Sequence, residues 1–557
     1  MSNRKLFNAE YPFPLKTEFL GKKLSGPFTI PSGIVTCSAN IIQRFFDQVP
    51  EVGVLTTKSI GLQPRLGYRE PILTQYEPGC FSNAVGLTNP GADSSAEQLD
   101  RLEIPDDRFL LISIFGASVE EYVKVAKKLA PFGDGLELNL SCPHAKGYGM
   151  AMGQDPELVQ EITSAVKNSV EIPVIPKLTP NVPNVDEIAK AASAGGADAI
   201  CAINTIGPEC HKAYGHPILA NEQGGVSGKA ILSTALRCVQ EIRASVNCPI
   251  IACGGISSAA NVRKFQEAGA SIIGIGSALI GMSTDDIANY FRALSTDLEA
   301  KSENAEKLVH YNIDMGFQPV TLVENHRITD DICILTFDKK INIEAGQFVF
   351  LWVPGLGEKP FSALVDDPFK LAVINLGVFT EYLMSLEPGA EAYVRGPHGN
   401  PVTPPRNSKI IAVAGGTGLA AVYQLARDFG NTEIFFGART KQRLYFVDES
   451  AEVSTLHTAT DDGSQGYQGV ITELLDEYLG KLSKDELSTL VFYNCGPSAM
   501  VRAAEIVEKK YSSPDRIFNA IDYLTKCGVG ICGACDSADG RRLCVDGPFL
   551  DAADCGS

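Results

Sequence analysis

The alternation of short apolar runs with helical patterns over the first 300 residues constrains the fold most strongly. Amphipathic helical patterns, as in residues 118–130, 185–195 and 233–246, separate runs that have the length and composition of strands. A chain that repeats strand and helix over this length forms either a (β/α)8 barrel or a doubly wound sheet. The strand-like runs cover residues 51–60, 109–118, 135–142, 172–181, 197–206, 249–256 and 270–280.

Chemically active side chains follow these apolar runs directly, and this placement favours the barrel. In a (β/α)8 barrel the active site is assembled at the C-terminal ends of the strands. We therefore predict an α/β chain that begins with a (β/α)8 barrel over residues 1–300. The side chains concerned are Lys58, Ser141, Cys142, Lys177, Asn204 and Thr205.

The pattern changes after residue 300. Residues 301–316 are charged and helical in pattern, which predicts a linker helix. Short alternating runs with polar turns over 317–405 indicate a small antiparallel β-barrel. A strand, a Gly-rich turn and a helix then open a Rossmann-like α/β domain at 406–515. Residues 516–557 form a small C-terminal domain with a cysteine-rich loop.

Composition excludes several classes of protein. The chain has 557 residues, 45% of them hydrophobic, so several domains with sizeable cores are expected. A net charge of −18 without a basic run argues against nucleic acid or an anionic membrane as partner. No apolar stretch approaches a signal core or a membrane span, which predicts a cytoplasmic protein. Its 15 cysteines are then expected as reduced thiols rather than disulfides.

Four cysteines near the C-terminus are spaced as ligands. Cys527, Cys532 and Cys535 form C-x4-C-x2-C, and Cys544 follows after eight residues. This order is typical of a plant-type [2Fe–2S] cluster, although the last spacer is short. A structural zinc site is the alternative, but such sites more often combine two C-x2-C halves. We expect Cys555 to be an ordinary thiol of the tail.

Glycines cluster at three late positions of the expected barrel. They lie in 224–228, which ends in Gly228, in the pair Gly254–Gly255, and in 274–277, which ends in Gly276–Ser277. Backbone N–H groups without a side chain can approach an anion, and the last strands of a barrel are the usual phosphate site. Together they indicate a phosphate-bearing cofactor. Beside an iron–sulfur cluster, flavin mononucleotide (FMN) is the natural candidate.

The segment 139–144 carries the clearest catalytic signal. Cys142 lies at a strand end and can act as a general base if its thiolate is accessible; the alternative is a buried, inert thiol. Amide side chains both donate and accept, which suits a ring with alternating C=O and N–H groups. A lysine suits a carboxylate. The nearby set Lys58, Asn83, Asn139 and Asn204 therefore suggests a pyrimidine substrate.

The motifs NLSCP, TTKS, SNAVGLTNPG, PKLTPN, INT and GGVSG resemble class 1 dihydroorotate dehydrogenases over nearly all of residues 1–300. The resemblance implies that Cys142 takes a proton from C5 of dihydroorotate while the C6 hydride passes to N5 of FMN. It implies substrate contacts by Lys58, Asn83, Gly86, Leu87, Asn139, Asn204 and Thr205. It implies FMN contacts by Ser32, Lys58, Ser59, Asn139, Lys177, Gly228, Gly254, Gly255, Gly276 and Ser277.

One residue departs from that family. His144 stands where the family usually has Asn, and SCPH followed by GQDPELV is similar to dihydropyrimidine dehydrogenases, which reduce uracil and thymine. The loop from Asn83 to Asn89 resembles the orotate type instead. Oxidation of dihydroorotate in pyrimidine biosynthesis is therefore the main hypothesis, and an NAD(P)H-dependent uracil or thymine enzyme is the alternative.

The second half carries four signals for nucleotides, of which the glycine turn at 415–418 is the better one. They are Lys359-Pro360-Phe361-Ser362, Gly377 with Thr380 at a helix start, and the turn Gly415-Gly416-Thr417-Gly418, followed later by Cys495-Gly496. In this order they resemble the ferredoxin reductase superfamily, which implies sites for FAD and NAD. Lys359 replaces the usual Arg and lacks its bidentate fork.

With the cysteine motif, the resemblance narrows to NAD-linked class 1B dihydroorotate dehydrogenases, with the catalytic subunit fused to its FAD/[2Fe–2S] electron-transfer subunit. It implies that electrons run from dihydroorotate through FMN, the [2Fe–2S] cluster and FAD to NAD. It also implies a homodimer formed through the barrel. A rival from another class is an electron carrier whose barrel only docks a redox partner.

Overall fold

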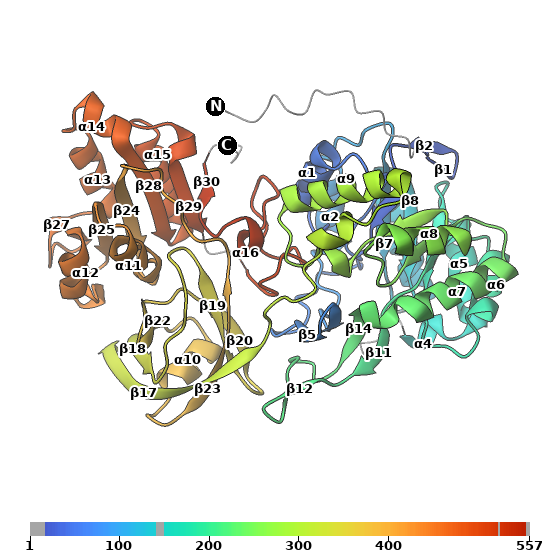
Figure 1. Cartoon of the computed structure of the whole chain (residues 1–557), viewed down its shortest axis with the longest axis horizontal. Coiled ribbons are helices and arrows are strands. Elements are labelled where there is room, and N and C mark those ends of the chain that lie inside the picture. The colour runs from blue at the N-terminus through green and yellow to red at the C-terminus, as the bar shows by residue number, and fades with distance from the viewer. Residues whose placement is uncertain (1–16, 141–149, 522–523, 553–557) are drawn as a thin grey trace. The chain divides into compact units, whose positions relative to one another are not determined.

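The computed structural model describes residues 17–140, 150–521 and 524–552 of the chain (Figure 1). The chain divides into two compact units, each described by itself below. The first unit takes residues up to 68, 76–209 and 223–312. The second takes 69–75, 210–222 and everything from 313 onward. Two short segments of the N-terminal half therefore belong to the second unit.

The first unit contains a closed barrel of eight parallel strands, as predicted. Their order around the barrel is β10-β15-β16-β3-β4-β7-β8-β9. The strands are β3 (Phe28–Ile30), β4 (Val54–Thr56), β7 (Phe109–Ile114), β8 (Gly135–Asn139), β9 (Val174–Leu178), β10 (Ile200–Ala202), β15 (Ile250–Cys253) and β16 (Ile272–Gly274).

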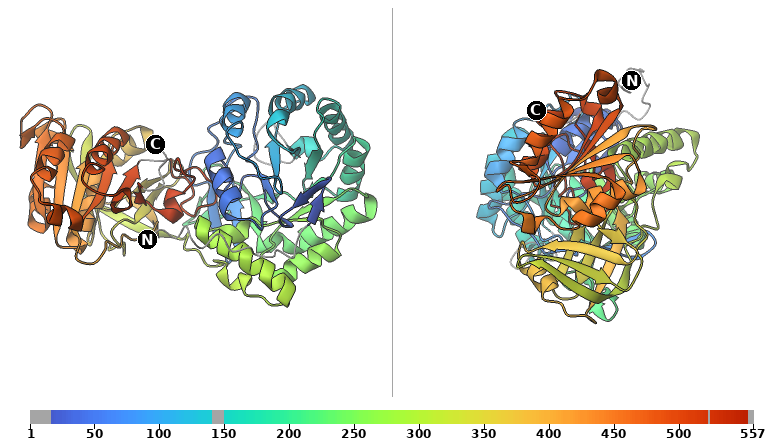
Figure 2. Two further views of the ribbon diagram at one scale, coloured as in Figure 1. Left: turned by 90° about the horizontal axis from the view of Figure 1, so that it is seen from above. Right: turned by 90° about the vertical axis from the view of Figure 1, so that its left-hand side faces the viewer.

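Helices surround these strands (Figures 1 and 2). They are α1 (Ala39–Gln48), α2 (Ala92–Leu99), α3 (Val119–Leu129), α4 (Met150–Gly153), α5 (Pro156–Lys167), α6 (Val185–Ala194), α7 (Leu232–Ser245), α8 (Ala259–Glu267) and α9 (Thr284–Ala300). Local signals start them where expected. Ser118 caps the N-terminus of α3, because its hydroxyl accepts a hydrogen bond from the N–H of Glu121. Lys127 and Lys128 in the last turn interact favourably with the negative end of the helix dipole.

The barrel strands are buried on both faces, which explains their continuous apolar runs. Buried side chains from several barrel strands pack as one cluster, among them Val54, Leu111, Ile175 and Ile251. Other short strands are β1 (Thr17–Phe19) with β2 (Lys22–Leu24) and a sheet in the order β11-β14-β6-β5, while β12 (Lys212–Ala213) and its partner β13 (His216–Pro217) belong to the second unit. The four-stranded sheet comprises β5 (Leu73–Glu77), β6 (Cys80–Asn83), β11 (Ile206–Glu209) and β14 (Gly224–Gly228).

The prediction of a linker helix at 301–316 is wrong. Helix α9 ends at Ala300, its C-cap residue Lys301 has a left-handed φ of 53°, and only one 3-10 turn follows in the described part of the segment, at Ala305–Leu308. The buried carboxylate of Asp297 causes the change, because it accepts hydrogen bonds from the Ser302 hydroxyl and the Ala305 N–H. These bonds fold the chain back on the end of α9 and override the helical composition of the segment.

The second unit begins with a seven-stranded antiparallel sheet in the order β20-β19-β23-β17-β18-β22-β21. Among the described strands, the two edge strands β20 and β21 do not pair with each other. The sheet is therefore open, where we expected a small closed barrel. Its strands are β17 (Phe317–Thr329), β18 (Ile332–Phe337), β19 (Phe348–Val353), β20 (Gly357–Phe361), β21 (Val365–Asp366), β22 (Phe369–Ile374) and β23 (Glu391–His398), and helix α10 spans Val378–Met384.

A second sheet in this unit is parallel except for its last strand, in the order β27-β26-β25-β24-β28-β29-β30. Alternate residues of β24 enter two different clusters: Ala412 packs with helix α11, and Ile411 packs with α13 and α15. Helices therefore cover both faces, as expected for a doubly wound domain. The sheet extends beyond the predicted boundary at 515, because the apolar strand β29 pairs with β28.

The elements of this domain are β24 (Lys409–Gly415), β25 (Thr432–Ala438), β26 (Thr455–Thr460), β27 (Tyr467–Gln468), β28 (Leu490–Gly496), β29 (Ile517–Ile521) and β30 (Leu550–Asp551). Its helices are α11 (Gly418–Asp428), α12 (Val447–Val453), α13 (Ile471–Leu479), α14 (Lys484–Thr489) and α15 (Ser498–Glu508). A short helix, α16 (Leu543–Asp546), follows the cysteine loop.

Candidate active site

Three predicted site residues are joined by hydrogen bonds at the strand ends of the barrel. Asn139 donates to the hydroxyl of Ser59 over 2.8 Å, and Asn204 donates to the Asn139 amide oxygen over 3.3 Å. Ser59 also contacts the hydroxyl of Ser32 at 3.0 Å. These residues follow or end different strands, so the closed barrel brings them together. The cluster presents amide and hydroxyl groups that can both donate and accept.

Lys177 lies in the same region and forms a buried ion pair that the sequence analysis missed. Its Nζ is 3.7 Å from Glu137, and both side chains are almost fully buried. Burial opposes the charge on Lys177, but the attraction of Glu137 prevails and raises the pKa of the ammonium. The hydroxyl of Ser113 also donates to Glu137. A carboxylate inside the apolar run 135–140, two positions before Asn139, was the available signal.

Lys58 follows strand β4, and its Nζ approaches the Cys37 thiol at 3.9 Å. Thr205 lies beside Asn204, whose side chain accepts from the Thr205 N–H. Neither residue contacts Lys177 in the hydrogen bonds and ion pairs that the structure gives for the described residues. Lys58 therefore places a positive charge next to the Cys37 thiol. The sequence did not indicate Cys37 as a site residue.

The loop from Asn83 to Asn89 is held in a defined shape. The Asn89 side chain accepts from the N–H groups of Gly61 and Gly91 and donates to the carbonyl of Leu87. Leu87 has a φ of 57°, a left-handed conformation that a leucine rarely adopts. Gly86 could not carry a side chain, because a Cβ would meet the Tyr68 backbone at 2.8 Å. Such constrained backbone is common where a protein binds a ligand.

Two of the three glycine turns meet. A Cβ on Gly255 would overlap the carbonyl of Gly228, and Gly254 and Gly255 both have positive φ. Gly276 instead lies near Ile34 and Pro31, and Ser277 starts a 3-10 turn. Close, side-chain-free backbone of this kind fits a phosphate group. The FMN phosphate assignment therefore agrees with the local geometry at Gly228 and Gly255.

The predicted base, Cys142, lies outside the described residues, as do Ser141 and His144. Asn139 and Leu140 immediately before them are described and buried. The assignment of Cys142 therefore remains a prediction.

In the second unit, the predicted nicotinamide residues meet at one point of the doubly wound sheet. Strands β24 and β28 are neighbours, with Ala414 opposite Cys495, and the strand order reverses between them. A Cβ on Gly418 would overlap the carbonyl of Cys495. Ligands of such sheets bind at this switch point, beyond the carboxyl ends of the strands. The turn Gly415-Gly416-Thr417-Gly418 and the pair Cys495–Gly496 thus form one candidate dinucleotide site.

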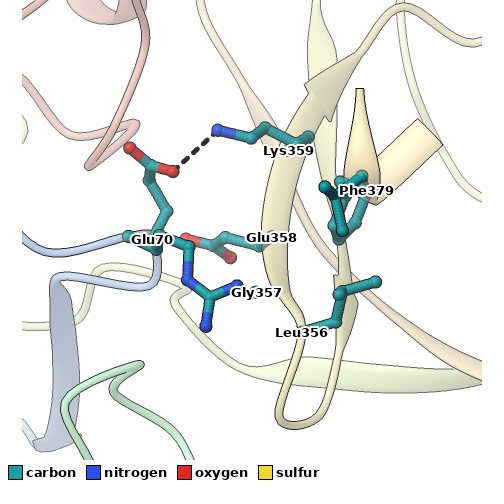
Figure 3. Close-up of a pocket in the computed structure, with 8 residues that line it drawn as sticks. Glu70, Leu356, Gly357, Glu358, Lys359 and Phe379 are labelled. Carbon is teal, nitrogen blue, oxygen red and sulfur yellow. Dashed lines mark hydrogen bonds and ion pairs between the residues drawn. The ribbon is translucent and has the colours of Figure 1, made fainter. Parts of the chain in front are cut away.

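Lys359 and Phe379 line a pocket of about 220 Å³ (Figure 3). Lys359 lies on β20 and forms a 2.8 Å ion pair with Glu70, a carboxylate that burial destabilises but that Lys359 and Lys526 keep at a lowered pKa. An anion bound at Lys359 would therefore compete with Glu70. Pro360 and Phe361 are paired in the sheet with Phe350 and Val349, and Ser362 follows β20.

Gly377 and Thr380 form the start of α10, but the Thr380 hydroxyl is already engaged. It accepts from the Leu376 N–H at 2.8 Å and donates to the carbonyl of Gly377. Thr380 thus stabilises the helix start itself.

The four predicted cluster cysteines are all buried: Cys527, Cys532 and Cys535 lie in the loop before α16, and Cys544 lies in α16 itself. The thiols of Cys535 and Cys544 are 3.5 Å apart, and the N–H of Gly530 donates to the sulfur of Cys544. Cys527 interacts with Cys532 and Cys544. Glycines 528, 530 and 533 have φ between 64° and 78°, so the loop needs residues without a Cβ.

None of the described His, Cys, Asp and Glu side chains form a group of three or more that could hold one metal ion. A [2Fe–2S] cluster has a different demand, because four thiolates share two iron atoms. The donor set, its burial and the N–H directed at Cys544 fit that group in chemistry. No disulfide forms among the described cysteines.

The closed barrel with its polar strand ends and the dinucleotide-type sheet are an architecture that suits an oxidoreductase, and two family models show that class. The dihydroorotate dehydrogenase family model matches residues 14–292, and the oxidoreductase NAD-binding domain model matches 412–505. The chain belongs to the dihydroorotate dehydrogenase family.

Curated relatives support this membership. The dihydroorotate dehydrogenase B (NAD(+)) catalytic subunit of Pyrococcus horikoshii is 41% identical over 48% of this chain and 86% of its own length. That of Methanocaldococcus jannaschii is 38% identical over 53% of this chain and 97% of its own length. The chain also resembles a crystal structure of DHODH in complex with ferulenol from Eimeria tenella, over 55% of this chain and 90% of that chain, at 20% identity and a TM-score of 0.45.

The described helices include none that is both long and apolar enough to cross a membrane.

Proposed function

We propose that this chain oxidises dihydroorotate to orotate in pyrimidine biosynthesis, with NAD+ as the final acceptor. The observation that carries the proposal is the linked set of Ser59, Asn139 and Asn204 at the strand ends of the barrel. Two amide side chains held in one cluster suit a pyrimidine ring, which offers alternating carbonyl and N–H groups. Family membership and the names of the relatives support the same substrate.

The roles of the barrel residues follow from their chemistry. Asn83, Asn139, Asn204 and Thr205 would orient the ring by hydrogen bonds, and Lys58 would neutralise the substrate carboxylate together with the backbone of Gly86 and Leu87. Cys142 would take the proton from C5. FMN, when bound, supplies the hydride acceptor. Lys177, kept protonated by Glu137, would hold a permanent positive charge beside it.

We propose that the second unit completes the enzyme in the same chain. The glycine turn beside Cys495–Gly496 would bind NAD, and the pocket at Lys359 would bind FAD once Glu70 releases the ammonium group. Cys527, Cys532, Cys535 and Cys544 would hold a [2Fe–2S] cluster, which supplies single-electron transfer. The NAD-binding domain match at 412–505 supports the dinucleotide part.

We further propose that the protein works in the cytoplasm as a homodimer formed through its barrel. Absence of disulfides among the described cysteines supports a reducing compartment. The dimer rests on the family resemblance alone.

Parallel steady-state assays test the substrate. We expect turnover with dihydroorotate and NAD+, and none with uracil and NADH; the reverse result would establish the dihydropyrimidine dehydrogenase alternative. Asn139→Ala should lower kcat/KM for dihydroorotate about tenfold or more, because it removes hydrogen bonds worth roughly 1 kcal/mol each, including the one that Asn139 donates to Ser59. Asn289→Ala, on the exposed side of α9, is the matched control and should leave kcat/KM unchanged.

A further inference from the structure

A fully buried ion pair of the second unit contacts the backbone of the cysteine loop. Arg395, on β23, donates two hydrogen bonds to Glu358, on β20: Nη2 to Oε1 at 2.7 Å and Nε to Oε2 at 3.2 Å. Both side chains are only 1% exposed. The guanidinium also lies over the ring of Phe350, 4.3 Å from its centre.

The third nitrogen of the Arg395 guanidinium, Nη1, contacts the backbone of a predicted cluster ligand. Nη1 lies 3.1 Å from the carbonyl oxygen of Cys527 and 3.2 Å from Nε2 of His398. Burial and the positive charge of Arg395 lower the pKa of His398 to about 3, so its ring is neutral and Nε2 is the acceptor. Arg395 thus directs a charged donor at the backbone of Cys527, and His398 fixes that orientation.

The same side of the loop carries a second charged group. Lys526 precedes Cys527, and its Nζ is 3.3 Å from Oε1 of Glu70, whose other oxygen binds Lys359. All of these residues belong to the second unit. Arg395, Lys526 and Lys359 with Glu358 and Glu70 are therefore a group of three cations and two carboxylates, which carries one net positive charge.

Stability alone does not account for this arrangement. Removing two opposite charges from water costs several kcal/mol per ion, and apolar side chains of similar volume are often as stabilising as a buried pair. A buried charge near a redox group has a direct electrostatic consequence instead. Charges and hydrogen bonds around an iron–sulfur cluster set its reduction potential, since the cluster gains one negative charge on reduction.

We propose that Arg395 and Glu358 are positioning residues that set the reduction potential of the cluster at the Cys527 loop, with opposite signs. Arg395 favours the reduced cluster through its charge and its bond to the Cys527 carbonyl, and Glu358 moderates that effect. The inference rests on the proposed [2Fe–2S] cluster. It adds a role for two residues, Arg395 and Glu358, that are not ligands of the cluster.

An anaerobic redox titration of the holoenzyme, followed by electron paramagnetic resonance of the reduced cluster, tests the signs. Glu358→Gln leaves the guanidinium uncompensated, so the reduced-to-oxidised ratio at a fixed potential should rise about tenfold, equivalent to about 59 mV for one electron. Arg395→Gln removes the charge and the carbonyl donor, so the ratio should fall by a similar factor. Arg395→Lys keeps the charge and should shift the ratio less than Arg395→Gln.

The matched control is Glu433→Gln, which removes a carboxylate paired with Lys409 and His457 in the parallel sheet and should leave the potential unchanged. Shifts of the same sign in Glu358→Gln and Arg395→Gln, or no shift in either, would overturn the proposal. If Arg395→Gln does not fold, Glu358→Gln and Arg395→Lys still decide it. Iron analysis distinguishes a failure of the proposed function from a failure of this inference. Wild-type protein without iron contradicts the proposed function. Two iron atoms per chain, with the same reduction potential in the variants as in the wild type, contradict only this inference.

Discussion

Lys177 shows how single residues prepare the barrel site. The ammonium group is almost fully buried and is kept charged by Glu137, which is itself held by the Ser113 hydroxyl. A permanent positive charge in the interior is costly without such a partner. The two residues should therefore behave as a unit.

Glu137→Gln tests this dependence. It leaves the Lys177 charge uncompensated, so we expect the barrel near β8 and β9 to lose roughly 3–5 kcal/mol of stability, the usual cost of breaking a buried pair. Hydrogen exchange of peptides spanning these strands measures the change. The double variant Glu137→Gln/Lys177→Met should recover much of the loss; equal destabilisation in both variants would show that the pair is not coupled.

Cys142→Ala tests the proposed base. The rate of dihydroorotate oxidation should fall by a factor of about 10²–10⁴, the usual contribution of a general base, while FMN content stays unchanged. Cys210→Ser, at an exposed cysteine, serves as control and should keep the wild-type rate. Unchanged turnover in Cys142→Ala would remove this residue from the mechanism.

Among the elements, strands β24 and β28 depend on a residue without a side chain. The start of α11 packs against the end of β28 so closely that a Cβ on Gly418 would overlap the Cys495 carbonyl. Gly418→Ala should therefore push the start of α11 away from the end of β28 and weaken NAD binding at least tenfold, as measured by calorimetry. Gly430→Ala is the matched control, since a Cβ there has nothing within 4 Å. Equal affinity in both variants would exclude the switch point as the NAD site.

Helix α15 carries a buried carboxyl that makes this domain sensitive to pH. Glu508 accepts from the Asn494 amide on β28, but burial raises its pKa to about 8 from 4.5. Between these values the folded state binds one more proton than the unfolded state. Stability should therefore fall by roughly 1.4 kcal/mol per pH unit from about pH 4.5 to pH 8, and level off above.

Glu508→Gln should remove that slope and make the domain more stable than wild type at pH 8. Hydrogen exchange of β28 peptides at several pH values measures both effects. A wild-type stability that rises over this range would contradict a protonated Glu508.

Across the whole molecule, the local patterns predicted the architecture better than the long-range pairings. The eight-stranded barrel and the doubly wound sheet follow from periodicity, which each segment carries in itself. The helix expected at 301–316 failed because Asp297, outside the segment, captures its backbone. No local signal places residues 69–75 with the second unit, since Glu70 meets Lys359 almost 300 positions later.

The candidate site shows the same division. Asn139, Asn204 and Ser59 were predicted and are joined, because strand-end positions converge in any such barrel. Glu137 was missed although a carboxylate inside an apolar strand is unusual. The link from Arg395 to Cys527 joins residues more than 100 positions apart, and no spacing rule could have indicated it.

In the proposed function, one chain carries electrons from dihydroorotate to NAD+ without a partner protein. Anaerobic addition of dihydroorotate to the purified protein, followed by absorption spectra with flavin and iron analysis, tests this proposal. We expect one FMN, one FAD and the two iron atoms of one [2Fe–2S] cluster per chain, all reduced by dihydroorotate and reoxidised by NAD+. Bleaching of a single flavin only, or zinc in place of iron, would contradict it.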